Sequence, residues 1–127
     1  MWTLATALWS YAMHEASIAG GILKLVEDAA QREGFRRVTV LRLMAGQLAG
    51  VEAHALRFSL EALAPGTCLQ QASFEIDEPP GQAWCPDCNE AVALKQRGEA
   101  CPVCGNYRLQ VTGGTELRVV EMMVEDD

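Results

Sequence analysis

Two matched cysteine pairs constrain the fold of this chain more than any other feature of its sequence. They consist of Cys85, Cys88, Cys101 and Cys104, and in each pair a proline follows the first cysteine. Thiolates three positions apart can reach one ion from a tight turn, and the twelve residues 89–100 allow the second pair to complete a tetrahedron. Gly105, which follows the last cysteine, permits the positive φ that directs backbone N–H groups at sulfur. The spacing therefore predicts a metal site with four cysteine ligands.

Zinc is the ion that such a site favours. Four thiolates close the coordination shell of Zn²⁺, which has no redox chemistry, and a closed site is of the structural kind. Iron bound as in rubredoxin and a pair of redox dithiols are the alternatives that the same cysteines allow. A closed zinc site leaves no open position for catalysis, so we expect the activity to lie elsewhere in the chain.

Acidic side chains dominate the charge of the chain. Seventeen Asp and Glu residues against ten Lys and Arg residues give a formal net charge of −7. Such a surface repels nucleic-acid phosphates and anionic lipids. Between residues 84 and 114 the basic residues are Lys95, Arg97 and Arg108. A zinc-ribbon module that binds nucleic acid or protein stays open as the alternative function, but we expect no nucleic-acid partner and no membrane partner.

The sequence lacks clear export and membrane signals. No apolar run reaches the ~18 residues of a membrane span, and residues 1–12 contain no basic region typical of a secretion signal. We therefore expect a cytoplasmic protein. Thiols stay reduced in that compartment, which favours a metal site over disulfides.

Hydrophobic periodicity predicts two helices. Between residues 14 and 34 apolar side chains recur at helical spacing, and Gly34 provides a natural end. This stripe contains Ile18, Ile22, Leu25, Val26 and Ala29. Residues 50–66 form a second amphipathic helix that Pro65 and Gly66 end. Its apolar face contains Leu56, Leu60 and Leu63, with Ala55 and Phe58 beside them.

Three segments have strand character. Residues 36–46 are rich in β-branched and aliphatic side chains on both faces, which predicts a central strand. Residues 68–81 alternate between apolar and polar side chains. The inward side chains of that segment are Ala72, Phe74 and Ile76. Residues 117–125 resume strand character. The fifth cysteine, Cys68, is expected to be a small buried side chain in the second of these strands.

The order of these elements predicts an α+β fold. We expect a small mixed three-stranded sheet with two helices, plus an inserted four-cysteine zinc-ribbon-like domain between the glycines and prolines at 79–81 and 113–114. The predicted divisions are an N-terminal extension (1–12), an α+β domain (13–80 and 112–127) and a zinc-binding domain (81–111).

The chain has two histidines, His14 and His54. His54 lies between alanines on the second helix, where an exposed or partly packed imidazole is the default, so we assign it no role. His14 is followed by Glu15 at the start of the first helix. By itself this pair is weak support for a site, because Glu15 would favour the positive end of the helix dipole and His14 could lie at the surface.

Several motifs taken together resemble the hydrogenase maturation nickel metallochaperone family (HypA/HybF). In chain order they are "MHEASIAGGIL", "GVEAHALRFSLEALAPGT", "ASFEIDEPPGQAWCPDC", "CPVCGN" and "GGTELRVVEMMVE", which together run from Met13 to about Glu125. The resemblance implies a small nickel-binding domain interrupted by a zinc domain. It further implies a protein that is not an enzyme and that delivers Ni²⁺ to the large subunit of [NiFe]-hydrogenase with a partner GTPase.

The resemblance also implies which residues hold the metals. The family's essential nickel ligand corresponds to His14, with Glu15 beside it, and the α+β domain becomes the nickel-binding domain. The chemistry of Ni²⁺ adds the backbone nitrogen of Met13 as a candidate donor. The structural zinc ligands correspond to the four paired cysteines. Imidazole is a good donor for Ni²⁺, and square-planar Ni²⁺ can add adjacent backbone nitrogens. A carrier must release its metal, so few side-chain ligands suit moderate affinity.

Some members of the family also serve urease, and histidines flank their zinc cysteines. No histidine flanks the cysteines of this chain. We therefore expect hydrogenase alone to be served, and a zinc site insensitive to mild acid apart from protonation of the thiolates themselves.

Residues 1–12, "MWTLATALWSYA", depart from the family pattern. We expect a misassigned upstream start, with Met13 as the true first residue; a genuine extension or a short helix packed on the domain are the alternatives. If the segment is present, the amine of Met13 becomes an amide. The oligomeric state stays open, a homodimer included.

Overall fold

The chain divides into two units in a computed structural model that describes the backbone of residues 2–126 and the side chains of residues 14–126. The first unit comprises Met1–Arg42, Glu52–Glu75 and Val119–Asp127. The second comprises Leu43–Val51 and Ile76–Arg118. Each unit is thus assembled from separate stretches of the chain.

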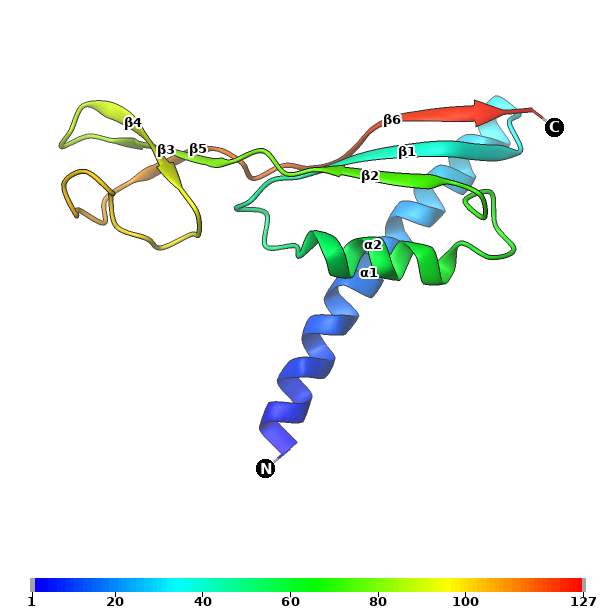
Figure 1. Ribbon diagram of the computed structural model, residues 1–127, viewed down its shortest axis with the longest axis horizontal. Coiled ribbons are helices and arrows are strands. Elements are labelled where there is room, and N and C mark those ends of the chain that lie inside the picture. Colours follow the sequence, from blue (N-terminus) through cyan, green and yellow to red (C-terminus); the bar gives the residue numbers. More distant parts are fainter. Residues whose placement is uncertain (1, 127) are drawn as a thin grey trace. The chain divides into compact units, whose positions relative to one another are not determined.

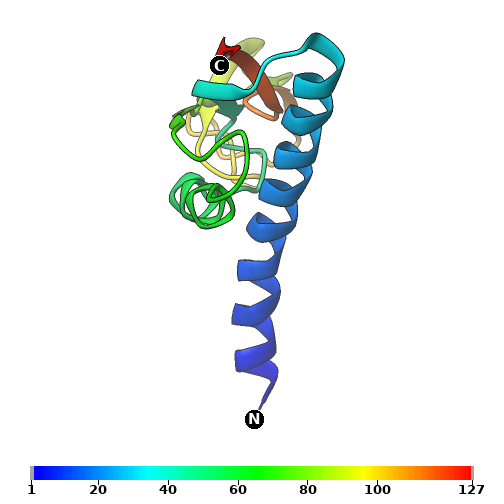
Figure 2. The ribbon, with the colours of Figure 1, turned by 90° about the vertical axis from the view of Figure 1, so that its right-hand side faces the viewer.

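Helix α1 runs from Trp2 to Glu33 as one continuous helix of 32 residues (Figure 2). It ends at Gly34, as predicted, where a φ of 82° and an N–H donated to the Ala30 carbonyl at 2.8 Å close the last turn. Despite this length, no helix within residues 2–126 is long and apolar enough to cross a membrane.

The buried face of α1 differs partly from the predicted stripe. Ala19, Val26 and Ala29 are buried, which confirms two members of the stripe and adds Ala19. Leu25, by contrast, is 54% exposed, so its assignment to the core was wrong. Successive helical residues point about 100° apart, and Leu25 therefore turns away from a face that Ala19 and Val26 define.

Helix α2 runs from Ala53 to Leu63 and begins with a cap that the sequence analysis did not identify. The Glu52 side chain accepts the N–H of Ala55 at 2.6 Å, which satisfies one free donor of the first turn. Leu56 and Leu60 are buried as predicted. Phe58, 63% exposed, and Leu63 face away from the core, so the predicted apolar face was too wide.

The first sheet contains β2 (Ser73–Asp77), β1 (Arg37–Ala45) and β6 (Leu117–Glu125) in the order β2-β1-β6. The prediction of a central strand at 36–46 is confirmed, because β1 lies between the other two. Arg36 N–H bonds to Glu125 O at one end and Gly46 N–H to Glu116 O at the other, which sets β6 antiparallel to β1. β2 and β1 run side by side in the same direction (Figure 1), so the sheet is mixed as predicted.

The second sheet belongs to the cysteine-containing unit and has the order β4-β3-β5. β3 (Gly81–Cys85) pairs antiparallel with β4 (Glu90–Leu94) and with β5 (Gln110–Gly113), as Figure 1 shows. Ala83 and Cys85 on β3 are buried in alternation with exposed neighbours, which is the pattern of a half-covered strand. The predicted α+β fold with a zinc-ribbon-like domain is confirmed.

Cys68 does not lie in a strand. It sits in the turns that precede β2, half-buried, where its carbonyl accepts the N–H of Val38 at 2.9 Å. The expected strand begins only at Ser73 because residues 64–72 make a series of turns, including Thr67 N–H to Ala64 O.

Candidate metal centre

The four paired cysteines meet at one point of the second unit. All four Sγ atoms lie within 4.8 Å of one another. Cys85 Sγ lies 3.7 Å from Cys104 Sγ, and Cys88 Sγ lies 3.9 Å from Cys101 Sγ. A tetrahedral zinc ion with Zn–S bonds of ~2.3 Å places its sulfurs about 3.8 Å apart. The cluster therefore fits zinc in both ligand type and spacing.

The two cysteine pairs form equivalent turns, which we call knuckles (85–88 and 101–104). Asn89 N–H donates to Cys85 O at 2.8 Å, and Gly105 N–H donates to Cys101 O at the same distance. Asn89 has a φ of 54° and Gly105 a φ of 77°. The positive φ expected at Gly105 is confirmed. Asn89 has a positive φ at the equivalent position of the first knuckle, and asparagine is one of the residue types that tolerate this conformation best.

Backbone donors and crowding give the thiols unequal acidity. Cys88 N–H points at Cys85 Sγ at 3.5 Å and Val103 N–H at Cys101 Sγ at 3.4 Å. Donors from the backbone of Cys104 and Val103 lower the pKa of the Cys101 thiol to about 7. Hydrogen bonding to Cys104 and burial among the other sulfurs raise the pKa of Cys88. Sulfurs this close resist simultaneous ionisation, a repulsion that a divalent cation removes.

A small apolar core supports the knuckles. Cys85 and Cys101 are buried and pack in one cluster whose other members are Leu48, Ala83, Val92 and Leu94. Cys104 is exposed and Cys88 half-buried. Cys85 and Cys101 are thus held by the apolar core, whereas Cys104 faces solvent.

The predicted nickel residues lie on α1 in the first unit, with unlike surroundings. The His14 side chain is exposed, whereas Glu15 is 1% exposed. Glu15 Oε2 accepts the N–H of Glu52 at 3.2 Å, and Glu15 Oε1 is buried without a hydrogen-bond partner among the described residues. The side chain of Met13 lies outside the described residues, and its backbone is helical.

The structure therefore brings the four cysteines together. The two predicted nickel ligands differ in exposure, because His14 is exposed and Glu15 is buried. Within residues 14–126, His14 joins no group of three or more potential metal-ligating side chains. Glu52 is the neighbour that the sequence analysis missed. Glutamate is not among the residues that usually cap helices, so the sequence offered little sign of this cap, and the contact of Glu52 with Glu15 depends on how the helices pack.

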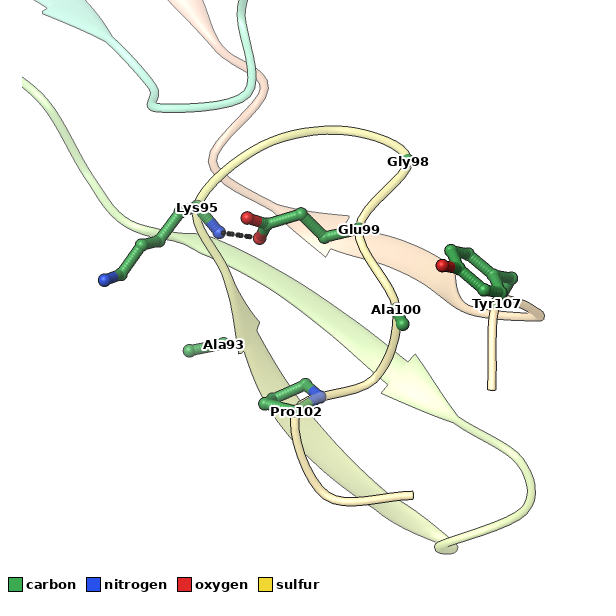
Figure 3. A pocket seen from close by; sticks show the side chains of 7 residues that line it. All are labelled: Ala93, Lys95, Gly98, Glu99, Ala100, Pro102 and Tyr107. Atoms are coloured by element: carbon green, nitrogen blue, oxygen red, sulfur yellow. Dashed lines mark hydrogen bonds between the residues drawn. The ribbon is translucent and has the colours of Figure 1, made fainter. Parts of the chain in front are cut away.

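A surface hollow of about 660 Å³ lies beside the second knuckle, with Lys95 and Tyr107 at opposite sides (Figure 3). Its apolar lining consists of Ala93, Ala100 and Pro102. The Glu99 carboxylate accepts the N–H groups of Lys95 at 2.9 Å and Gln96 at 3.2 Å, as the dashed line in Figure 3 marks for Lys95. Glu99 thus supports a turn, and the residues that line the hollow provide no cluster of metal ligands.

Comparison with known sequences gives a match over nearly the whole chain. The family described as "Hydrogenase/urease nickel incorporation, metallochaperone, hypA" matches residues 13–124. The hydrogenase maturation factor HypA of Polaromonas naphthalenivorans is 67% identical over 115 residues, which cover 91% of this chain and 100% of that protein. The factor of the same name from Cupriavidus necator is 68% identical over 114 residues, which cover 90% of this chain and 96% of that protein.

Solved structures show the same fold at much lower identity. The solution structure of the Ni metallochaperone HypA from Helicobacter pylori aligns with a TM-score of 0.61 at 16% identity, over 89% of this chain and 98% of that one. A second solution structure, described as that of HypA protein, aligns with a TM-score of 0.61 at 21% identity, over 91% and 98% of the two chains.

Proposed function

Because this chain belongs to the HypA family of hydrogenase and urease nickel-incorporation metallochaperones, we propose that it binds Ni²⁺ near His14 and delivers it to the large subunit of [NiFe]-hydrogenase during maturation. Zinc held by the four cysteines is the permanent, structural ion. The exposed imidazole of His14, directly followed by a buried carboxylate, is the observation that carries the nickel site.

His14 suits a metal that has to be passed on. Imidazole is a favourable ligand for Ni²⁺, and an exposed imidazole can be reached by a partner protein without unfolding. A site with few side-chain ligands releases its ion more readily than a closed one. Nickel is accordingly the cargo of this protein, and we assign no catalytic reaction to it.

Glu15 is the second member of the proposed site. One of its oxygens is engaged by the Glu52 N–H, while Oε1 keeps its full capacity to accept from a metal-bound water or to approach the metal itself. A buried acceptor without a partner is costly, so occupation of this oxygen would favour the loaded state.

Met13 supplies a backbone nitrogen in the proposed site. Within α1 this nitrogen belongs to a peptide bond, and helical N–H groups are directed at the carbonyl four residues earlier. It can serve as a donor only where the helix opens near Met13 or where the chain begins with that residue. The full nickel geometry therefore depends on residues 1–12.

Zinc and nickel have different tasks in this proposal. Residues 81–111 bind zinc, which supplies folding energy to a unit with a small apolar core, and residues 13–80 with 112–127 carry nickel. The partners are the maturation GTPase and the hydrogenase large subunit, in the cytoplasm, where the thiolates stay reduced. The zinc ion is structural in this proposal, because four thiolates fill its coordination shell and leave no position for a water molecule to be activated.

Calorimetric titration of Ni²⁺ into zinc-loaded protein tests the assignment. We expect His14→Ala to weaken nickel binding by at least about tenfold, which is ~1.4 kcal/mol, while the zinc content stays unchanged. His54→Ala removes the other imidazole, exposed on α2, and is the matched control that keeps wild-type affinity. Equal nickel binding by wild type and His14→Ala would remove His14 from the site.

A further inference from the structure

A side-chain hydrogen bond links the first knuckle to the segment that leaves the second. The Nδ2 group of Asn106 donates to Oδ2 of Asp87. We call these two residues the clasp. Asp87 directly precedes Cys88, and Asn106 lies two residues after Cys104. All four residues belong to the second unit, so the clasp connects the two halves of the cysteine cluster within that unit.

Two backbone groups fix Asn106 in place. Its carbonyl oxygen accepts the N–H of Cys101 at 2.8 Å, and its Oδ1 accepts the N–H of Arg108 at 2.8 Å. Because Oδ1 already accepts from a backbone donor, the side-chain amide has one orientation, with Nδ2 directed at Asp87. The Asn106 side chain is thus aligned by its own segment before it reaches the first knuckle.

The four zinc ligands are not equally protected from solvent. Cys85 and Cys101 are buried in the apolar core. Cys88 is half-buried, whereas Cys104 is exposed. An ion with four ligands leaves only after one of them detaches, and a competing ligand in solution reaches the exposed thiolate first. The restraints on the chain beside Cys104 should therefore govern how readily zinc is lost.

The clasp requires an amide at one position and a carboxylate at the other. Asn106→Asp would keep the acceptor for the Arg108 N–H, but its second oxygen would face the Asp87 carboxylate, and two carboxylates in contact repel each other. Asn106→Ala would remove both side-chain bonds. Asp87→Asn together with Asn106→Asp would exchange donor and acceptor, restore the bond and leave the net charge of the chain unchanged.

We propose that Asp87 and Asn106 are positioning residues that control the retention of zinc. The clasp holds the segment after Cys104 against the first knuckle and so limits detachment of the one exposed ligand. This inference goes beyond the proposed function, because it concerns loss of the structural ion and is independent of nickel binding at His14. The clasp lies at the surface, with Asp87 exposed and Asn106 half-buried, so it acts without support from the apolar core.

The rate at which full-length, zinc-loaded, nickel-free protein passes zinc to an excess of a chromophoric chelator tests the inference. We expect Asn106→Ala to release zinc at least about threefold faster than wild type, because a hydrogen bond of ordinary strength is lost. Asn106→Asp should release it faster still, because repulsion replaces the bond. The double variant Asp87→Asn with Asn106→Asp should return the rate to within about twofold of wild type.

Glu90→Ala is the matched control, because it removes an exposed carboxylate two residues from Cys88 and leaves the clasp intact. We expect its release rate to stay within about twofold of wild type. Brief alkylation with iodoacetamide during release, followed by mass spectrometry, identifies the ligand that detaches. Among the four ligands we expect Cys104 to be labelled first, and faster in Asn106→Ala than in wild type.

Three outcomes overturn the inference. They are wild-type release by Asn106→Ala, first labelling of another of the four ligands, and a double variant that releases zinc as fast as Asn106→Asp alone. Should Asn106→Asp take up no zinc, recovery of one zinc per chain in the double variant supports the clasp, and failure to recover overturns it. None of these measurements involves nickel, so failure of the proposed nickel site would leave the result unchanged.

Discussion

The backbone N–H of Glu52 donates a hydrogen bond of 3.2 Å to Oε2 of Glu15, which joins the first turn of α2 to the buried face of α1. A carboxylate near a helix N-terminus is favoured by the free N–H groups and the helix dipole there. Glu15 is thus a structural acceptor within the first unit as well as a candidate nickel residue. Substitution of Glu15 should therefore affect the stability of the protein as well as its nickel binding.

Replacement of Glu15 should lower stability even without nickel. We expect Glu15→Ala to reduce the free energy of unfolding by about 1 kcal/mol or somewhat more, because the partly buried N–H of Glu52 loses its acceptor. Glu15→Gln, which keeps an oxygen at the same place, should cost less. Urea unfolding of zinc-loaded, nickel-free protein measures both, with the exposed Glu27→Ala on α1 as control. A Glu15→Ala protein as stable as the control would show that this contact contributes nothing.

The segment before Met13 should control the strength of nickel binding. A chain that begins at Met13 offers an amine to the metal, whereas the helical peptide nitrogen of the full chain does not. We expect the shortened chain to bind Ni²⁺ at least about tenfold more tightly, with more protons released. Calorimetry in two buffers of different ionisation enthalpy measures both quantities. Identical affinity and proton release would mean that Met13 contributes no nitrogen.

Two glycines inside α1 should be replaceable with a gain in stability. A Cβ atom on Gly20 or Gly21 meets nothing within 4 Å, so close packing does not explain them. We expect Gly20→Ala and Gly21→Ala to stabilise the protein by about 1 kcal/mol each, seen as a higher Tm. Gly34→Ala, at a φ of 82°, is the control and should lower the Tm. A lower Tm of the Gly20→Ala and Gly21→Ala variants would show that α1 requires glycine at these positions.

Cys68 should react slowly with alkylating reagents. Burial, with repulsion from the Glu27 carboxylate, raises the pKa of its thiol. At any given pH its thiolate fraction is therefore smaller than that of an ordinary cysteine, and alkylation should rise only at higher pH. Mass spectrometry of zinc-loaded protein treated with iodoacetamide across pH values follows this. Glu27→Gln should move the profile to lower pH, and an unshifted profile would exclude the carboxylate as a cause.

Features with a strong local pattern were predictable from the sequence. The strand at 117–125 coincides with β6 because β-branched and aliphatic side chains predominate there after the turn residues, which favours a strand. The positive φ of Gly105 followed from the geometry of the knuckle. The four cysteines were predicted to converge, and they do so because ligand spacing is encoded within short turns.

Features that depend on packing between distant segments were not predictable. Nothing in the residues around Leu48 indicates that it enters a core formed by residues 76–118. The burial of Glu15 was equally hidden, since a charged residue is rarely buried without a partner, and its partner is a backbone N–H of another helix. Leu25, which is exposed, was wrongly predicted as a core residue because helical spacing alone does not fix which edge of an apolar stripe is buried.

Metal retention after a chelator challenge tests the central claim most directly. Protein loaded with both metals is exposed to a moderate chelator, separated by gel filtration and analysed for zinc and nickel. We predict that nickel leaves and zinc stays at one per chain in the wild type, that His14→Ala retains zinc but never acquires nickel, and that Cys85→Ser loses zinc. Loss of both metals together, or retention of nickel at the cysteines of His14→Ala, would contradict a transferable ion at His14 and a permanent one at the thiolates.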